Sequence, residues 1–110
     1  MDPSTWTPAI GLDQLPEGKG VRVTLDGTDV LMIRSGESVL AVANRCTHQG
    51  APLHKGVVKL AGSMPTVQCP VHGSVFRLRD GGVLRGPATQ PLPAYDARVN
   101  GSTVEVRPRA

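Results

Sequence analysis

The chain has 110 residues with one Trp, one Tyr and one Phe, so we expect a single small domain over residues 1–110 with a core of aliphatic side chains. Its formal net charge is +3, but the twelve Lys and Arg residues are scattered along the chain, which argues against nucleic acid as a partner. The sequence has no apolar run long enough to span a bilayer and no signal-peptide pattern, so we expect no membrane association and a cytoplasmic location.

Short strands separated by turns dominate the predicted structure, and residues 11–15 form the one candidate helix. Strands are predicted, in chain order, over residues 21–25, 29–34, 38–44, 67–69, 74–79, 82–85, 95–99 and 103–107. Glycine-containing pairs predict hairpin turns at 26–27, 35–36, 80–82 and 100–101. Without sustained helical periodicity, the pattern indicates an all-β fold, either an antiparallel sandwich or a small barrel.

Both cysteines and all three histidines fall in two short segments. CTHQGAPLHKG, residues 46–56, contains Cys46 and His48, and CPVHGS, residues 69–74, contains Cys69 and His72. In a cytoplasmic protein, cysteines are more often metal ligands or free thiols than disulfide partners. If the β scaffold brings the two segments together, they offer a four-ligand metal site.

Tetrahedral zinc and a two-iron cluster both suit two thiolates and two imidazoles. Zinc sites usually pair like ligands within one segment, whereas each segment here is mixed. A mixed segment favours a cluster, because the ligands to its two irons lie side by side. Gly50 and Gly73 allow close approach of backbone N–H groups to sulfide, and Pro70 stiffens the second segment. The spacing therefore favours iron and leaves zinc open.

CTHQGAPL and CPVHGSVF resemble the two cluster-binding loops of Rieske [2Fe-2S] proteins. The resemblance extends from LPEGKGVRV to GPATQPLPAYDARV, which is similar to the proline-containing loop and closing strands of that family. It implies one [2Fe-2S] cluster, with Cys46 and Cys69 on the inner iron and His48 and His72 on the outer iron. It also implies a β scaffold with an inserted cluster-binding subdomain.

In that subdomain, the resemblance places cluster-binding loops at about residues 45–56 and 68–76 and the proline loop at about 86–94. The residues expected around the cluster are Gly50, Pro70, Gly73, Ser74, Phe76 and Pro87. Rieske proteins of cytochrome bc complexes have an extra cysteine in each loop and a membrane anchor, but the matching positions here are Ala51 and Val71. The chain is thus similar to a soluble Rieske-type ferredoxin.

The resemblance also predicts a modest reduction potential. Ser74 matches a position whose hydroxyl donates to a cluster sulfur in high-potential members, and Phe76 stands where those members have a tyrosine that does the same. Hydrogen bonds to cluster sulfur stabilise the reduced state. We therefore expect a potential in the lower or middle part of the range of about −150 to +300 mV.

The sequence shows no nucleophile beside a base, no paired carboxylates and no phosphate loop, so catalysis by this chain alone is not expected. The resemblance implies a one-electron carrier between a flavin-dependent reductase and an oxygenase such as a ring-hydroxylating dioxygenase, docking at the edge formed by His48 and His72. Two alternatives are the Rieske-like small subunit of a larger oxidoreductase such as nitrite reductase, and a structural zinc module for protein interaction.

Four other residues receive modest roles. His54 is expected to stabilise its loop rather than to act as a fifth ligand, and Trp6 to cover part of the core. Arg45 and Lys55 flank the first loop, where they either steer an acidic partner or are ordinary solvated charges.

Overall fold

The computed structural model describes residues 2–62 and 64–109. In chain order its elements are β1 (Thr7–Gly11), η1 (Leu12–Gln14), β2 (Val21–Leu25), β3 (Thr28–Ser35), β4 (Ser38–Ala43), η2 (Leu53–Lys55), β5 (Val57–Lys59), β6 (Thr66–Gln68), β7 (Val75–Arg77), β8 (Val83–Arg85), β9 (Ala94–Asn100) and β10 (Thr103–Pro108). Neither 3-10 helix within the described residues has the length or apolar character needed to cross a bilayer.

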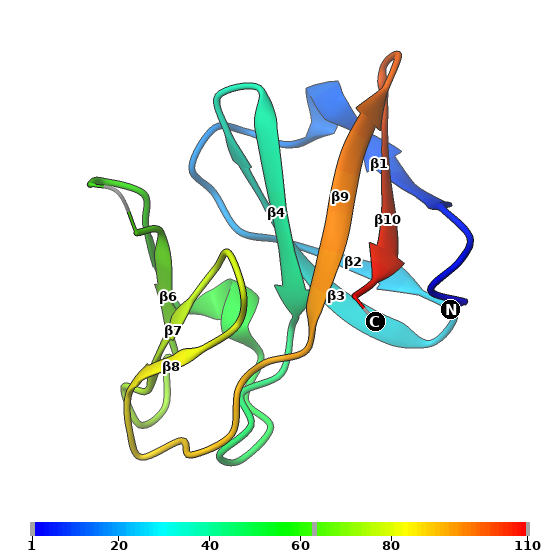
Figure 1. The fold of residues 1–110 in the computed structure, drawn as a ribbon. Coiled ribbons are helices and arrows are strands. Elements are labelled where there is room, and N and C mark those ends of the chain that lie inside the picture. The colour runs from blue at the N-terminus through cyan, green and yellow to red at the C-terminus, as the bar shows by residue number, and fades with distance from the viewer. Residues whose placement is uncertain (1, 63, 110) are drawn as a thin grey trace.

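The strands form two antiparallel sheets. The larger has the order β1-β10-β9-β4-β3-β2, and its edge strands approach each other, so that it curls into a nearly closed barrel (Figure 1). The smaller has the order β5-β6-β7-β8 and is inserted between β4 and β9 of the barrel. The predicted all-β fold with an inserted subdomain is confirmed.

Strand β3 is buried on both faces, which explains its continuous apolar run. Val30 and Met32 lie in the barrel core, whereas Leu31 and Ile33 lie in a second core between the barrel and the smaller sheet. Side chains on a strand alternate between faces, so one strand can serve both cores. The second core also contains both cysteines, and the fold therefore builds the site residues into packed structure.

The structure contains two strands that the sequence pattern does not predict. β1 contains Pro8 and has an irregular register between Pro8 and Ile10, which suits an edge strand but hides the alternation. β5 has only three residues and directly follows Gly56. Both strands are too short or too irregular to show a hydrophobic alternation. Only their pairing with β10 and β6 identifies them as strands.

Some predicted bounds change for identifiable reasons. The strand expected at 74–79 ends at Arg77, because the residue opposite Leu78 is Pro65, which accepts the Leu78 N–H at 2.9 Å but has no N–H to complete the pair. The candidate helix at 11–15 is a 3-10 turn over Leu12–Gln14. The turn at 26–27 is confirmed, with Asp26 at φ 50° and Gly27 at φ 75° as a two-residue hairpin turn requires.

Two other hairpin turns lie one residue later than predicted. Ser35 pairs with Ser38, and Asn100 pairs with Thr103, so the central residues are 36–37 and 101–102. In each turn the glycine occupies the first central position with positive φ, 62° in Gly36 and 65° in Gly101.

Candidate metal centre

The loop that follows β4 is closed by two backbone hydrogen bonds around Cys46. The Cys46 N–H donates to the carbonyl of Ala51 at 2.9 Å, and the Gly50 N–H donates to the carbonyl of Cys46 at 2.7 Å. Gly50 has φ 76°, a left-handed conformation that strongly favours glycine. The chain therefore turns back on itself directly after His48.

The loop between β6 and β7 repeats this geometry around Cys69. The Cys69 N–H donates to the carbonyl of Ser74 at 2.8 Å, and the Gly73 N–H donates to the carbonyl of Cys69 at 3.2 Å. Gly73 has φ 79°. Two loops of matching backbone form thus present one cysteine and one histidine each.

The proline loop between β8 and β9 ties the two cysteine loops together. The Thr47 hydroxyl of the first loop donates to the carbonyl of Gln90 at 2.6 Å, and the Ala88 N–H donates to the hydroxyl oxygen of Ser74 in the second loop at 3.0 Å. Figure 1 shows this end of the molecule at the bottom of the view, beyond the ends of β4 and β9. The three loops form one tip.

Within this tip the thiols are inside and the imidazoles are outside. Cys46 and Cys69 are free thiols with only 2% and 4% of their surface exposed. His48 and His72 are exposed, and their ring centroids lie 5.2 Å apart in an edge-to-face arrangement. The structure therefore places the two imidazoles beside each other at the surface of the tip and both thiols in the core behind its surface.

The environment of Cys46 disfavours a free thiolate. Burial raises the pKa of the Cys46 thiol, the neighbouring Cys69 thiol raises it further, and hydrogen bonds from the backbone N–H groups of His48 and Gln49 act in the opposite direction. A bound metal cation supplies the positive charge that ionises such a thiol.

The donor set fits a two-metal cluster better than a single ion. Within the described parts of the chain, no three His, Cys, Asp or Glu side chains gather closely enough to hold one metal ion. A tetrahedral zinc ion needs its four ligands around one point. A histidine-ligated two-iron cluster needs only two protein ligands at each iron. A buried thiol pair and an exposed imidazole pair satisfy the second requirement.

The other residues expected around the cluster lie on the three loops of the tip or in strand β7, which follows the second loop. Ser74 and Phe76 are fully buried behind the second loop, and Pro70 is exposed on it. Pro87 is exposed in the proline loop and follows a cis peptide bond. Ser74 accepts a hydrogen bond from Ala88, which leaves its own hydroxyl proton available to another acceptor.

Asn44 is a structural residue of the first loop that the sequence analysis missed. Its side chain is buried, its Oδ1 accepts the backbone N–H of His54 at 2.7 Å, and its Nδ2 lies 2.8 Å from His54 Nδ1. These bonds join the start of the loop to its end and confirm the loop-stabilising role of His54. A polar residue directly after strand β4 and two residues before Cys46 was the available signal.

A family model described as a Rieske-like [2Fe-2S] domain matches residues 5–107 of the chain. The ferredoxin component of a naphthalene 1,2-dioxygenase system from Pseudomonas aeruginosa is 30% identical over 101 residues, which cover 92% of this chain and 93% of that protein. These matches favour the iron–sulfur interpretation of the site over the structural zinc interpretation.

Solved structures show the same likeness. The ferredoxin of carbazole 1,9a-dioxygenase from Nocardioides aromaticivorans has a TM-score of 0.87 and 34% identity, covering 96% of this chain and 99% of that one. A putative NADH-dependent nitrite reductase small subunit from Mycobacterium tuberculosis has a TM-score of 0.80 and 36% identity, covering 96% of both chains. A ferredoxin–oxygenase complex of carbazole 1,9a-dioxygenase matches with a TM-score of 0.83 and 25% identity, covering 96% of both chains.

Proposed function

Because the chain belongs to the Rieske-like [2Fe-2S] domain family, we propose that it is a one-electron carrier, the ferredoxin component of an oxygenase system such as a ring-hydroxylating dioxygenase. The observation that carries this proposal is the tip itself, where two buried thiols and two exposed imidazoles 5.2 Å apart stand on matched loops. When bound, the [2Fe-2S] cluster supplies a centre that accepts and releases one electron.

The proposed ligands are Cys46 and Cys69 on the inner side and His48 and His72 on the outer side. The cysteines lie within the second core, which keeps water from their side of the site. The histidines are exposed, so a partner that docks on the tip contacts their rings directly. An electron carrier needs one such exposed edge and no substrate pocket.

The proposed partners are a flavin-dependent reductase as donor and a terminal oxygenase as acceptor. Ferredoxin–oxygenase contact is known for the structural relative from carbazole 1,9a-dioxygenase, which supports the acceptor. We place the carrier in the cytoplasm, as one domain over residues 1–110, with catalysis left to the partner enzymes.

Metal analysis and spectroscopy of the purified protein test the cofactor and its ligands. We expect two irons and two sulfides per chain and, after reduction with dithionite, the electron paramagnetic resonance signal with low average g that histidine ligation gives. His48→Cys and His72→Cys should each change this signal. His54→Gln is the matched control, since His54 bonds Asn44 and should leave the signal unchanged. One zinc per chain, or unchanged spectra in both ligand variants, would contradict the assignment.

The likeness to a nitrite reductase small subunit supports a second candidate, a fixed subunit of a larger reductase. Size-exclusion chromatography of the protein from its native cells separates the two. A free carrier elutes near its own mass of 11.6 kDa, whereas a subunit co-elutes with a large redox protein. Reconstitution with an oxygenase and its reductase then tests the first candidate directly.

A further inference from the structure

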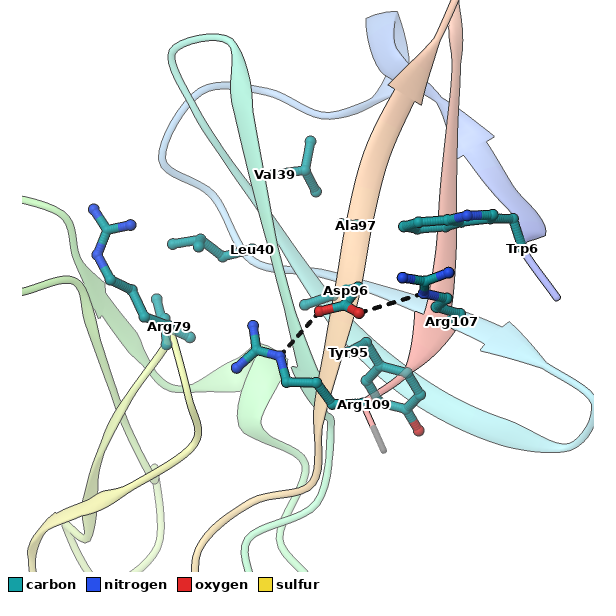
Figure 2. Close-up of a pocket in the computed structure, with 11 residues that line it drawn as sticks. Trp6, Val39, Leu40, Arg79, Tyr95, Asp96, Ala97, Arg107 and Arg109 are labelled. Atoms are coloured by element: carbon teal, nitrogen blue, oxygen red, sulfur yellow. Dashed lines mark hydrogen bonds and ion pairs between the residues drawn. The ribbon is translucent and has the colours of Figure 1, made fainter. Parts of the chain in front are cut away.

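A polar hollow opens on the side of the barrel, where strands β4 and β9 diverge (Figure 2). The two strands pair only at Ala41–Tyr95 and Val42–Ala94, although both continue beyond these pairs. Leu40 and Asp96, the next residues in this register, therefore lie on opposite strands without forming a ladder pair. The hollow has a volume of about 320 Å³ and shares no lining residue with the tip that carries the cysteines and histidines.

Arginine side chains surround this hollow. Arg107 and Arg109 share the carboxylate of Asp96, with Nε–Oδ distances of 3.4 and 3.1 Å (Figure 2). Arg79 lies on the opposite wall, in the turn after β7, and within the described residues no carboxylate lies at ion-pair distance from it. Three arginine residues and one aspartate thus line the hollow.

The nearby carboxylates do not cancel this excess. Glu105 pairs with Arg98 at 2.7 Å, and Asp80 pairs with Arg77 at 2.9 Å. Arg77 and Arg109 both lower the pKa of Asp80, with hydrogen bonding from Arg77 the largest cause, so this carboxylate stays ionised and engaged. These pairs and those of Asp96 join four arginines to three carboxylates, and Arg79 is a fifth arginine, so the surface retains positive charge.

Trp6 forms one rim of the hollow. The guanidinium carbons of Arg98 and Arg107 lie 4.3 and 4.4 Å from the centre of its ring. Trp6 lines the hollow together with Leu78 and Tyr95, which belong to the two cores, so its role as a cover of the core stays a prediction. Cation–π contact holds the indole and the arginines in place.

We propose that this hollow is a docking site for an extended, acidic segment of a partner protein. The diverging edges of β4 and β9 offer backbone hydrogen-bonding groups to an added strand, which is a recurrent mode of peptide recognition. Arg79 and Arg109 receive carboxylates on its side chains, and the indole of Trp6 contacts the segment at the rim. The partner thereby binds at β4 and β9, and the cysteine and histidine loops of the tip remain accessible.

The single tryptophan of the chain supplies the test, because Trp6 lines the site. A capped peptide of alternating glutamate and valine is titrated into the oxidised protein at low salt while tryptophan fluorescence is followed. We expect a saturable change that weakens with added salt, since exposed charges are screened. The same peptide with glutamine in place of glutamate should give no saturable change, and equal binding of both peptides would overturn the proposal.

Protein variants test whether peptide binding depends on this hollow or only on the net positive charge of the protein. The double variant Arg79→Gln and Arg109→Gln should weaken peptide binding about fivefold, the effect of losing two exposed ion pairs. Arg22→Gln and Lys19→Gln together remove the same charge from an exposed region outside the lining of the hollow and should leave the affinity unchanged. Equal weakening by both double variants would overturn the proposal.

Amide chemical shifts of the labelled protein locate the peptide independently of fluorescence. Shifts in β4 and β9 that saturate with peptide support the site. Shifts confined to the cysteine and histidine loops, or no shifts and no fluorescence change at all, overturn it. The position of these shifts is independent of the metal content of the tip, so failure here leaves the electron-carrier proposal standing.

Discussion

Replacing Asn44 with alanine removes the side chain that joins the two ends of the first cysteine loop. Asn44 is 4% exposed, and its amide makes two short contacts with His54, one to the backbone N–H at 2.7 Å and one to the ring at 2.8 Å. An alanine at this position offers neither donor nor acceptor. The loop that carries Cys46 and His48 then loses its closure.

The expected cost follows from these two bonds. A typical intramolecular hydrogen bond contributes about 1 kcal/mol net, so the two together contribute about 2 kcal/mol to the free energy of unfolding. For a domain near 100 residues, 1 kcal/mol corresponds to roughly 4–8 °C in Tm, and Asn44→Ala should lower Tm by about 10 °C.

Thermal and urea unfolding of the oxidised protein, followed by far-ultraviolet circular dichroism and by visible absorbance, measures this cost. Asn100→Ala is the matched control, because Asn100 is exposed and its amide makes one long contact of 3.5 Å with Glu105. The control should change stability by less than about 0.5 kcal/mol. Equal stability of the two variants would refute the role assigned to Asn44.

Three further predictions concern the core and the site. Gly81 has φ 79°, and a Cβ added there would lie far inside van der Waals contact distance of the Leu92 carbonyl oxygen, so Gly81→Ala should cost about 3 kcal/mol or more in urea unfolding. Gly27 has φ 75° but open space around it, so Gly27→Ala should cost about 1–2 kcal/mol. Burial raises the pKa of Tyr95, the only tyrosine, so its tyrosinate absorbance should appear above the ordinary pKa of about 10. The stability that this group contributes is fully present below the ordinary pKa and is lost as pH rises through the raised pKa of the folded protein. Tyr95→Phe should therefore remove this decline of stability at high pH. A tyrosinate midpoint at the ordinary value would contradict this. Phe76 lacks a hydroxyl, so voltammetry should give a potential in the lower or middle part of about −150 to +300 mV, and a value near the top would contradict the role given to Phe76.

Local patterns explain why much of the barrel was predictable. Strand β2 has the predicted bounds, and its turn at 26–27 depends only on residues that accept positive φ. The edge strand β1 was missed because Pro8 and an irregular register conceal its alternation, and only pairing with β10 reveals it. Strand β7 ended early because Pro65, the residue opposite Leu78 and directly before β6, has no N–H to continue the ladder, and this depends on a segment distant in the sequence.

At the site, too, local sequence patterns were predictive and contacts between distant segments were not. The spacing of Cys46 and His48, and of Cys69 and His72, was enough to propose the four ligands, because each pair is local in sequence. The link through Ser74 and the proline loop, and the bond between Asn44 and His54, depend on contacts between separate segments. No periodicity or motif encodes such contacts, because they arise from how the smaller sheet packs on the barrel.

The all-β character, the two loops that each carry a cysteine and a histidine, and the family follow from the sequence, since strand alternation, turn chemistry and residue spacing are properties of short segments. The burial of both thiols, the exposure of both imidazoles, and the divergence of β4 and β9 between Arg79 and Trp6 are visible only in the folded protein. Burial and strand divergence depend on long-range packing, in which each side chain is placed by neighbours distant in the chain.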